Sequence, residues 1–188
     1  MPISFDSQGG RSPMGLQLTS GCARAPGEFR EPAMIDFLPR TLVLGGRISV
    51  NAPLWRAFEL FSPDGERLWV PGWDPEILQP RGTSWEEGLL FRTREENGEA
   101  IWIITRLDPV SCHVRYHRVE PGRYIARIDV RCTAASPEST EVATTYAFTG
   151  LSESGNEEIA RMSQESYDAK MARWSVWIDA LLRTKRAN

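Results

Sequence analysis

The sequence predicts an α+β fold in which an antiparallel β-meander packs against one long C-terminal helix. Between residues 88 and 149, short runs of alternating apolar and polar residues are separated by turn signals. Near the C-terminus, apolar residues recur at helical spacing, with no Pro or Gly between Glu157 and Arg183. The length of 188 residues, 41% of them hydrophobic, suits a single domain with a substantial core.

Residues 1–39 differ from the rest of the chain. They are rich in Gly, Pro, Ser and Arg, and they show neither helical nor strand periodicity. We therefore expect a largely unstructured N-terminal extension, followed by one domain over residues 40–188.

The ordered part is predicted to begin with a strand and a short helix. Residues 41–50 are rich in β-branched and aliphatic side chains, which favours a strand. Asn51 and Pro53 form a helix-start signal. Four apolar residues follow at helical spacing, namely Leu54, Ala57, Phe58 and Phe61. Residues 62–65 are predicted to end this helix. Residues 68–75 are predicted to form a loop, because prolines interrupt both helices and central strands.

Five strands are predicted after this loop, at residues 88–95, 99–107, 111–119, 123–134 and 140–149. Asn97-Gly98 is a strong hairpin signal, and the short connections imply antiparallel pairing. Alternation leaves the side of Trp102 open, because residues 100–104 are apolar on both faces. It assigns to the inner face Phe91, Val114, Tyr116, Tyr124, Ala126, Ile128, Val130, Cys132, Val142, Thr144, Tyr146 and Phe148.

The last predicted element is an amphipathic helix from the capping box of Ser154 and Glu157 to about Arg183. At 1.5 Å per residue, such a helix is roughly 40 Å long. One side carries the more polar residues Arg161, Glu165, Asp168 and Asp179. The other side is a broad apolar stripe of Ile159, Ser163, Tyr167, Met171, Trp174, Trp177, Ile178 and Leu181.

Charge and cysteine usage argue against several functions. The net charge of −3 predicts no nucleic-acid partner, and the apolar runs are too short to insert into a membrane. Cys22, Cys112 and Cys132 show no metal-ligand spacing, and His113 and His117 lie about 13 Å apart in a strand. We therefore expect no metal and no cofactor. The sparse, odd cysteine count favours a reducing compartment and so a cytoplasmic location.

From about residue 40 to 184 the chain resembles the superfamily of birch-pollen-allergen-like and START lipid-transfer domains, also called SRPBCC or polyketide cyclase/dehydrase-like. The resemblance rests on Ile48–Pro53 followed by Trp55 and Phe58, on Trp69–Pro75, on Thr144–Thr149, and on the closing helix with Trp174. It implies a helix-grip fold, in which a curved antiparallel sheet of about six to seven strands wraps around the long C-terminal helix. Short helices follow the first strand in such a fold.

The resemblance also implies a cavity between the sheet and the helix. A ligand there would contact Trp73, Phe91, Tyr116, Ile128, Tyr146, Phe148, Tyr167, Met171 and Trp174. Alternatively, these side chains simply fill a core. Trp69 and Trp73 either gate the cavity mouth or plug the sheet edge.

Three functions remain open at this point. The first is binding of a small hydrophobic or aromatic molecule, because the predicted inner surface is apolar with a few hydroxyls. The second is a polyketide cyclase/aromatase-like enzyme, in which Tyr116 or Tyr146 polarises a carbonyl group. The third is an interaction module like the chaperone co-factors of the superfamily, which predicts no cavity. Ligand identity, any catalytic residue and oligomeric state are left open.

Overall fold

The computed structural model describes residues 37–79, 85–95 and 98–186. The predicted N-terminal extension falls almost entirely on residues 1–36, which lie outside the described residues. Within the described part of the chain, no helix is long and apolar enough to cross a membrane.

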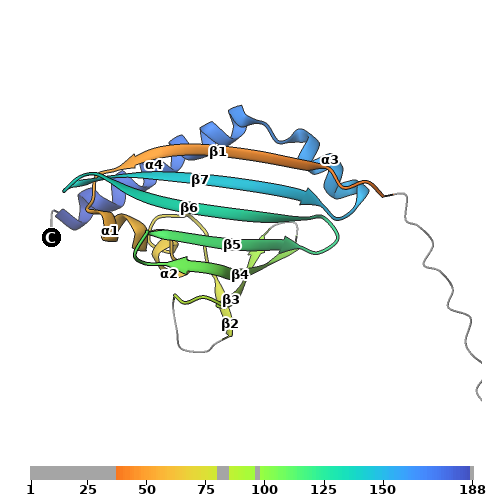
Figure 1. The fold of residues 1–188 in the computed structure, drawn as a ribbon, viewed down its shortest axis with the longest axis horizontal. Coiled ribbons are helices and arrows are strands. Elements are labelled where there is room, and N and C mark those ends of the chain that lie inside the picture. Colours follow the sequence, from red (N-terminus) through yellow and green to blue (C-terminus); the bar gives the residue numbers. More distant parts are fainter. Residues whose placement is uncertain (1–36, 80–84, 96–97, 187–188) are drawn as a thin grey trace, which may run out of the picture. The chain divides into compact units, whose positions relative to one another are not determined.

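The described elements are seven strands and four helices, in the order shown in Figure 1. They are β1 (Thr41–Val50), α1 (Leu54–Glu59), α2 (Pro63–Glu66), β2 (Glu76–Gln79), β3 (Leu90–Glu95), β4 (Gly98–Asp108), β5 (His113–Glu120), β6 (Tyr124–Ser136), β7 (Ser139–Gly150), α3 (Glu153–Arg161) and α4 (Gln164–Arg186). The strands form one antiparallel sheet in the order β1-β7-β6-β5-β4-β3-β2. The predicted meander is confirmed, with strand bounds that differ by a few residues.

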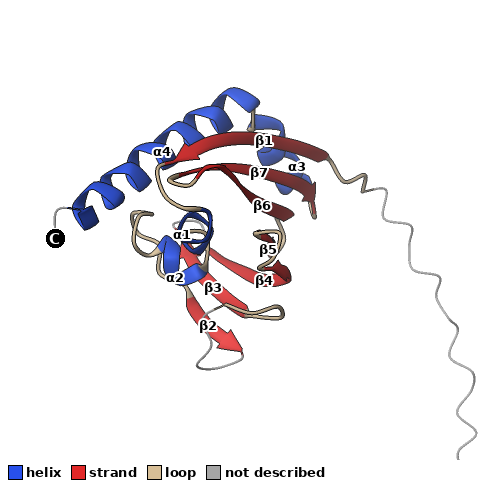
Figure 2. Cartoon of the chain, turned by 60° about the vertical axis from the view of Figure 1, so that its left-hand side comes forward, coloured by secondary structure: helices blue, strands red, loops and turns tan. Residues whose placement is uncertain are grey.

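The sheet is curved, and the helices occupy its concave side. Figure 2 shows the strands bending around α1 and α2, while α4 runs along β1. The inner-face side chains predicted by alternation are all buried, from Phe91 on β3 to Phe148 on β7. Trp102, whose side alternation left open, is also buried on this face, where it stacks on Phe91. The hydrophobic core therefore lies between the sheet and the helices.

The C-terminal helix differs from the prediction, because it is divided in two. The chain is extended at Met162, between α3 and α4. Ser163 lies at this break and is exposed, so its assignment to the apolar stripe was wrong. Its side chain accepts a hydrogen bond from the Ser166 backbone N–H at 3.1 Å, and its own N–H bonds the Ser166 hydroxyl at 3.3 Å. This reciprocal cap begins α4 without any Pro or Gly.

Two further start signals were misassigned. Ser152, not Ser154, caps α3, since its hydroxyl accepts a hydrogen bond from the Gly155 N–H. Ser62 opens α2 rather than only ending α1, because it caps the Gly65 N–H at 2.9 Å. The short edge strand β2 was not predicted, because it has four residues and directly follows Pro75.

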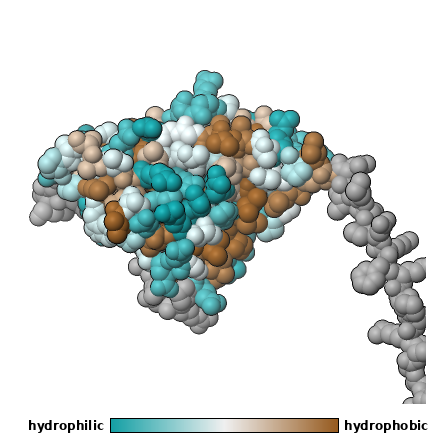
Figure 3. Space-filling model, viewed as in Figure 1, coloured by the Kyte–Doolittle hydropathy of each residue, from teal (hydrophilic) through white to brown (hydrophobic). Residues whose placement is uncertain are grey.

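The outer face of the sheet carries paired charges. Figure 3 shows hydrophilic residues gathered over the central strands on the visible side. Asp129 on β6 pairs with Arg115 at 2.9 Å and with Arg127 at 3.5 Å. His113 is buried and hydrogen-bonds Asp129 at 2.7 Å. Cys112 and Cys132 are buried free thiols. No group of three or more His, Cys, Asp or Glu suited to a metal occurs among the described residues.

Candidate ligand cavity

A partly enclosed cavity of about 200 Å³ lies between the inner face of the sheet and the helices. Its wall on the sheet side comes from β3, β4, β5, β6 and β7. Its wall on the helical side comes from Phe61 between α1 and α2, from α2, from the loop after α2, and from α4. The lining residues are Phe61, Pro63, Glu66, Val70, Trp73, Phe91, Trp102, Tyr116, Arg118, Ile128, Val130, Tyr146, Lys170 and Trp174.

Aromatic rings form much of the sheet wall. Phe91 and Trp102 stack nearly parallel with their ring centroids 5.6 Å apart, and Tyr116 meets both rings edge-on. The buried polar groups of these rings are satisfied by the protein itself. The Trp102 indole N–H donates to the Thr93 hydroxyl at 2.9 Å, and the Tyr116 hydroxyl donates to the Phe61 carbonyl at 2.7 Å. The rings are therefore held in place without a ligand.

The two loop tryptophans differ in their surroundings. Trp69 is buried, donates to the Leu60 carbonyl at 2.7 Å, and packs edge-on against Trp174 at 5.5 Å. This environment fits the plug interpretation for Trp69. Trp73 is half-buried, lines the cavity, and donates to the Pro63 carbonyl at 2.8 Å. A gating role for Trp73 stays a prediction.

Six of the nine residues predicted to contact a ligand line the cavity. These are Trp73, Phe91, Tyr116, Ile128, Tyr146 and Trp174. Phe148, Tyr167 and Met171 are buried but are not part of the cavity wall. Whether any of the nine contacts a ligand stays a prediction.

Close packing explains the position of Tyr167 and Met171. They approach β1 at Gly46, where an added Cβ would lie 2.9 Å from Met171 Cγ and 3.2 Å from Tyr167 Cε1. Thr144 Oγ1 hydrogen-bonds the Tyr167 hydroxyl at 2.6 Å and the Met171 sulfur at 3.3 Å. The first turns of α4 are therefore packed directly onto β1 and β7 through Tyr167 and Met171.

Three charged side chains also line the cavity, and the sequence analysis missed all of them. They are Glu66 on α2, Arg118 on β5 and Lys170 on α4. Glu66 lay between the predicted helix end at residues 62–65 and the predicted loop at residues 68–75, and Lys170 lay beside the apolar stripe. Arg118 was detectable, because it follows the inward-facing Tyr116 by two residues and so shares its face.

Lys170 is surrounded by aromatic rings. Its ammonium nitrogen lies 4.2 Å from the ring centroid of Tyr146, 4.8 Å from that of Trp174 and 5.7 Å from that of Tyr167. Such distances are typical of cation–π contacts, which stabilise a partly desolvated cation. The charge of Lys170 is thereby held at the inner surface of the protein.

The carboxyl group of Glu66 has a raised pKa. It is half-buried, and burial raises its pKa to about 8, although the nearby charge of Lys170 acts in the opposite direction. Most Glu66 side chains are therefore protonated at neutral pH. Burial also raises the pKa of Tyr116 and of Tyr146 well above the ordinary value, so both phenols stay protonated.

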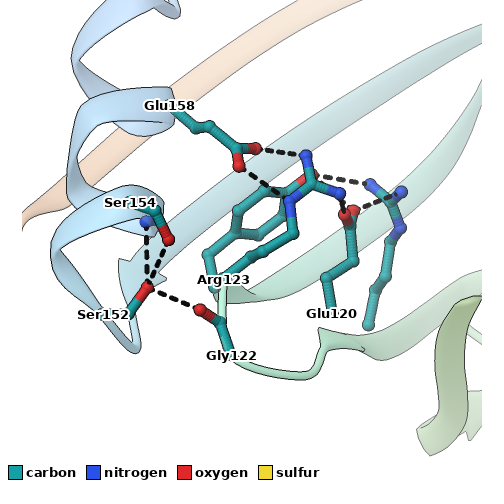
Figure 4. A network of polar contacts seen from close by, with 9 residues as sticks. Glu120, Gly122, Arg123, Ser152, Ser154 and Glu158 are labelled. Carbon is teal, nitrogen blue, oxygen red and sulfur yellow. Dashed lines mark hydrogen bonds and ion pairs between the residues drawn. The ribbon is translucent and has the colours of Figure 1, made fainter. Parts of the chain in front are cut away.

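A buried ionic network is built around Glu120 and Arg123 (Figure 4), and it includes the cavity residue Arg118. Glu120 is only 3% exposed and pairs with both Arg118 and Arg123. It also accepts a hydrogen bond from the Tyr124 hydroxyl at 2.5 Å. Arg123 in turn binds Glu158 of α3 through two hydrogen bonds. The network thus joins the β5–β6 turn to α3 and fixes the guanidinium of Arg118.

The same arrangement of sheet and helices occurs in solved structures. A point mutant of norcoclaurine synthase from Thalictrum flavum, bound to a transition-state analogue, matches with a TM-score of 0.58 over 79% of this chain and 99% of that one. The chain has the helix-grip fold. Ara h 8.0201 matches with a TM-score of 0.57 over 77% of this chain and 99% of that one. The Zhui aromatase/cyclase of a Streptomyces species matches with a TM-score of 0.50 over 77% and 93%.

Sequence identities in these matches are low, at 13%, 12% and 18%. No family model and no curated protein matches the sequence. A fold does not determine a function, so the function of this chain must be argued from its own cavity.

Proposed function

We propose that this protein binds a small hydrophobic or aromatic molecule in the cavity between the sheet and α4. The observation that carries the proposal is the cavity of about 200 Å³, walled largely by aromatic rings and bearing a few polar groups. This composition is typical of small-molecule sites. An engineered apolar cavity of about 150 Å³ in another protein binds benzene. A single-ring molecule is therefore a reasonable occupant here.

The structural neighbours support this size of ligand. One structure of norcoclaurine synthase contains dopamine and hydroxybenzaldehyde, two single-ring aromatics. The rings that would contact such a ligand here are already fixed by internal hydrogen bonds, for example that of Tyr116. Preorganised walls lower the entropic cost of binding.

Titration with toluene, followed by tryptophan fluorescence or calorimetry, tests the proposal. The wild-type protein should bind toluene in a saturable manner. Val130→Phe places a ring in the space occupied by the ligand, because Val130 is a buried cavity residue on β6. This variant should stay folded and lose binding. Val176→Phe, at an exposed position of α4, is the matched control and should bind normally. Equal binding to wild type and Val130→Phe would reject the cavity as the site.

A second candidate function is an enzyme of the cyclase/aromatase kind. It is favoured by Glu66, whose raised pKa near Lys170 suits proton transfer close to neutral pH. Incubating wild-type protein and Glu66→Gln with a metabolite extract of the source organism tests it. A compound consumed only by the wild type would support catalysis, whereas identical extracts would reject it.

The third possibility, an interaction module without a cavity, is disfavoured by the observed space. The expected cytoplasmic location remains part of the proposal.

A further inference from the structure

Most of the neutral polar groups on the cavity wall already have hydrogen-bond partners within the protein. The indole N–H groups of Trp73 and Trp102 both donate to protein oxygen atoms. The Tyr116 hydroxyl donates to the Phe61 carbonyl. A ligand can form a hydrogen bond with one of these donors only by replacing a bond that the fold already makes, so they add little to ligand recognition.

Tyr146 and Trp174 differ from these three residues. Among the described residues, neither the Tyr146 hydroxyl nor the Trp174 indole N–H has a hydrogen-bond partner. Both residues line the cavity, and both are more than nine-tenths buried, with exposed fractions of 8% and 9%. Neither polar atom is among the fully enclosed atoms that lack a partner. Each atom therefore borders open space, and a molecule in the cavity can reach it.

The two donors belong to the same part of the wall. The rings of Tyr146 and Trp174 have their centroids 4.2 Å and 4.8 Å from the same Lys170 nitrogen. The charges of two wall residues, Glu66 and Arg118, act on the Tyr146 hydroxyl, which is consistent with a hydroxyl directed towards the cavity. An indole N–H only donates. A phenol hydroxyl donates more readily than it accepts, because its lone pair is delocalised into the ring. This part of the wall therefore lacks an acceptor.

We propose that the ligand is an aromatic ketone or a related aromatic carbonyl compound, whose carbonyl oxygen accepts a hydrogen bond from the Tyr146 hydroxyl. This inference rests on the proposed function, because it specifies the ligand class of the same cavity. A carbonyl oxygen has two lone pairs, so it can accept from Tyr146 and also from Trp174. An aromatic molecule without an acceptor would remove water from the Tyr146 hydroxyl and offer no bond in return. Buried polar groups discriminate between ligands in this way.

Calorimetric titration with acetophenone and α-methylstyrene tests the inference. The two molecules have nearly the same shape, because a C=CH2 group in the hydrocarbon replaces the C=O group of the ketone. Tyr146→Phe should weaken acetophenone binding about fivefold, as expected for the loss of one neutral hydrogen bond. It should not weaken α-methylstyrene binding. Retained binding of the hydrocarbon shows that the cavity of the variant is intact.

Tyr124→Phe is the matched control. Tyr124 is buried, its hydroxyl donates to Glu120, and it is not part of the cavity wall. This substitution also removes one buried phenol hydroxyl, and it should preserve the ratio of the two affinities.

Three results would overturn the inference while leaving the proposed function intact. In the first, the wild-type protein binds α-methylstyrene but not acetophenone. In the second, Tyr146→Phe changes the affinities for both molecules by the same factor or changes neither. In the third, Tyr124→Phe weakens acetophenone binding as selectively as Tyr146→Phe. If the wild-type protein binds neither of these molecules nor toluene, the proposed function itself fails, and the inference fails with it.

Discussion

At the scale of single residues, burial raises the pKa of three groups that line the cavity, namely Glu66, Tyr116 and Tyr146. Glu66 illustrates the consequence for stability, because its pKa is about 8 in the folded protein against an ordinary value of 4.5. Between these values the folded state holds a proton that the unfolded state has lost. The contribution of Glu66 to stability is therefore greatest below about pH 4.5 and is lost as the pH rises towards 8.

Glu66→Gln removes this titration. Relative to the wild type, the variant should become steadily more stable between pH 5 and pH 8, as measured by urea unfolding at several pH values. Glu165→Gln, at an exposed position in the first turn of α4, should show no such trend. A stability difference for Glu66→Gln that is independent of pH would contradict the raised pKa.

The two cavity tyrosines should respond differently to loss of their hydroxyl groups. Tyr116→Phe leaves the buried Phe61 carbonyl without its donor and should lower the free energy of unfolding by about 1–3 kcal/mol. The Tyr146 hydroxyl makes no hydrogen bond to another described residue, so Tyr146→Phe should change stability little. Urea unfolding of both variants checks this. Equal losses would show that the Tyr116 hydrogen bond adds nothing.

At the scale of elements, α4 is positioned by its close approach to β1. Gly46→Val should push α4 away, because even a Cβ at this position would lie 2.9 Å from Met171 Cγ. We expect a loss of about 1–3 kcal/mol, as in other overpacked cores. Gly45→Val is the control, since a Cβ there meets its nearest atom at 3.4 Å. Thermal unfolding of both variants measures the difference, and equal melting temperatures would contradict this packing.

The elements also show what the sequence can predict. Strand alternation placed residues such as Ile128 and Val142 correctly, because a period of two is unambiguous when one face is buried. The helix division at Met162 was missed, since helical periodicity continues across it and its cap consists of Ser163 and Ser166. Such caps are visible in a sequence only when the break is already suspected.

At the scale of the whole molecule, the predicted meander and terminal helix were enough to predict the fold. They did not predict all the side chains that line the cavity. Six of the nine proposed contact residues line the cavity. Tyr167 and Met171 lie outside the cavity wall, because periodicity defines the buried side of α4 but not how far each turn lies from the sheet. Glu66 and Lys170 come from different helices, and only the folded chain brings them to one wall.

The central claim is that the space between the sheet and α4 accepts an aromatic ring. The most direct measurement is a crystal structure of the protein from crystals soaked in toluene. The account predicts electron density for one ring bounded by Phe91, Tyr146 and Trp174. A structure in which side chains such as Trp73 fill this space, and toluene is absent from it, would contradict the account.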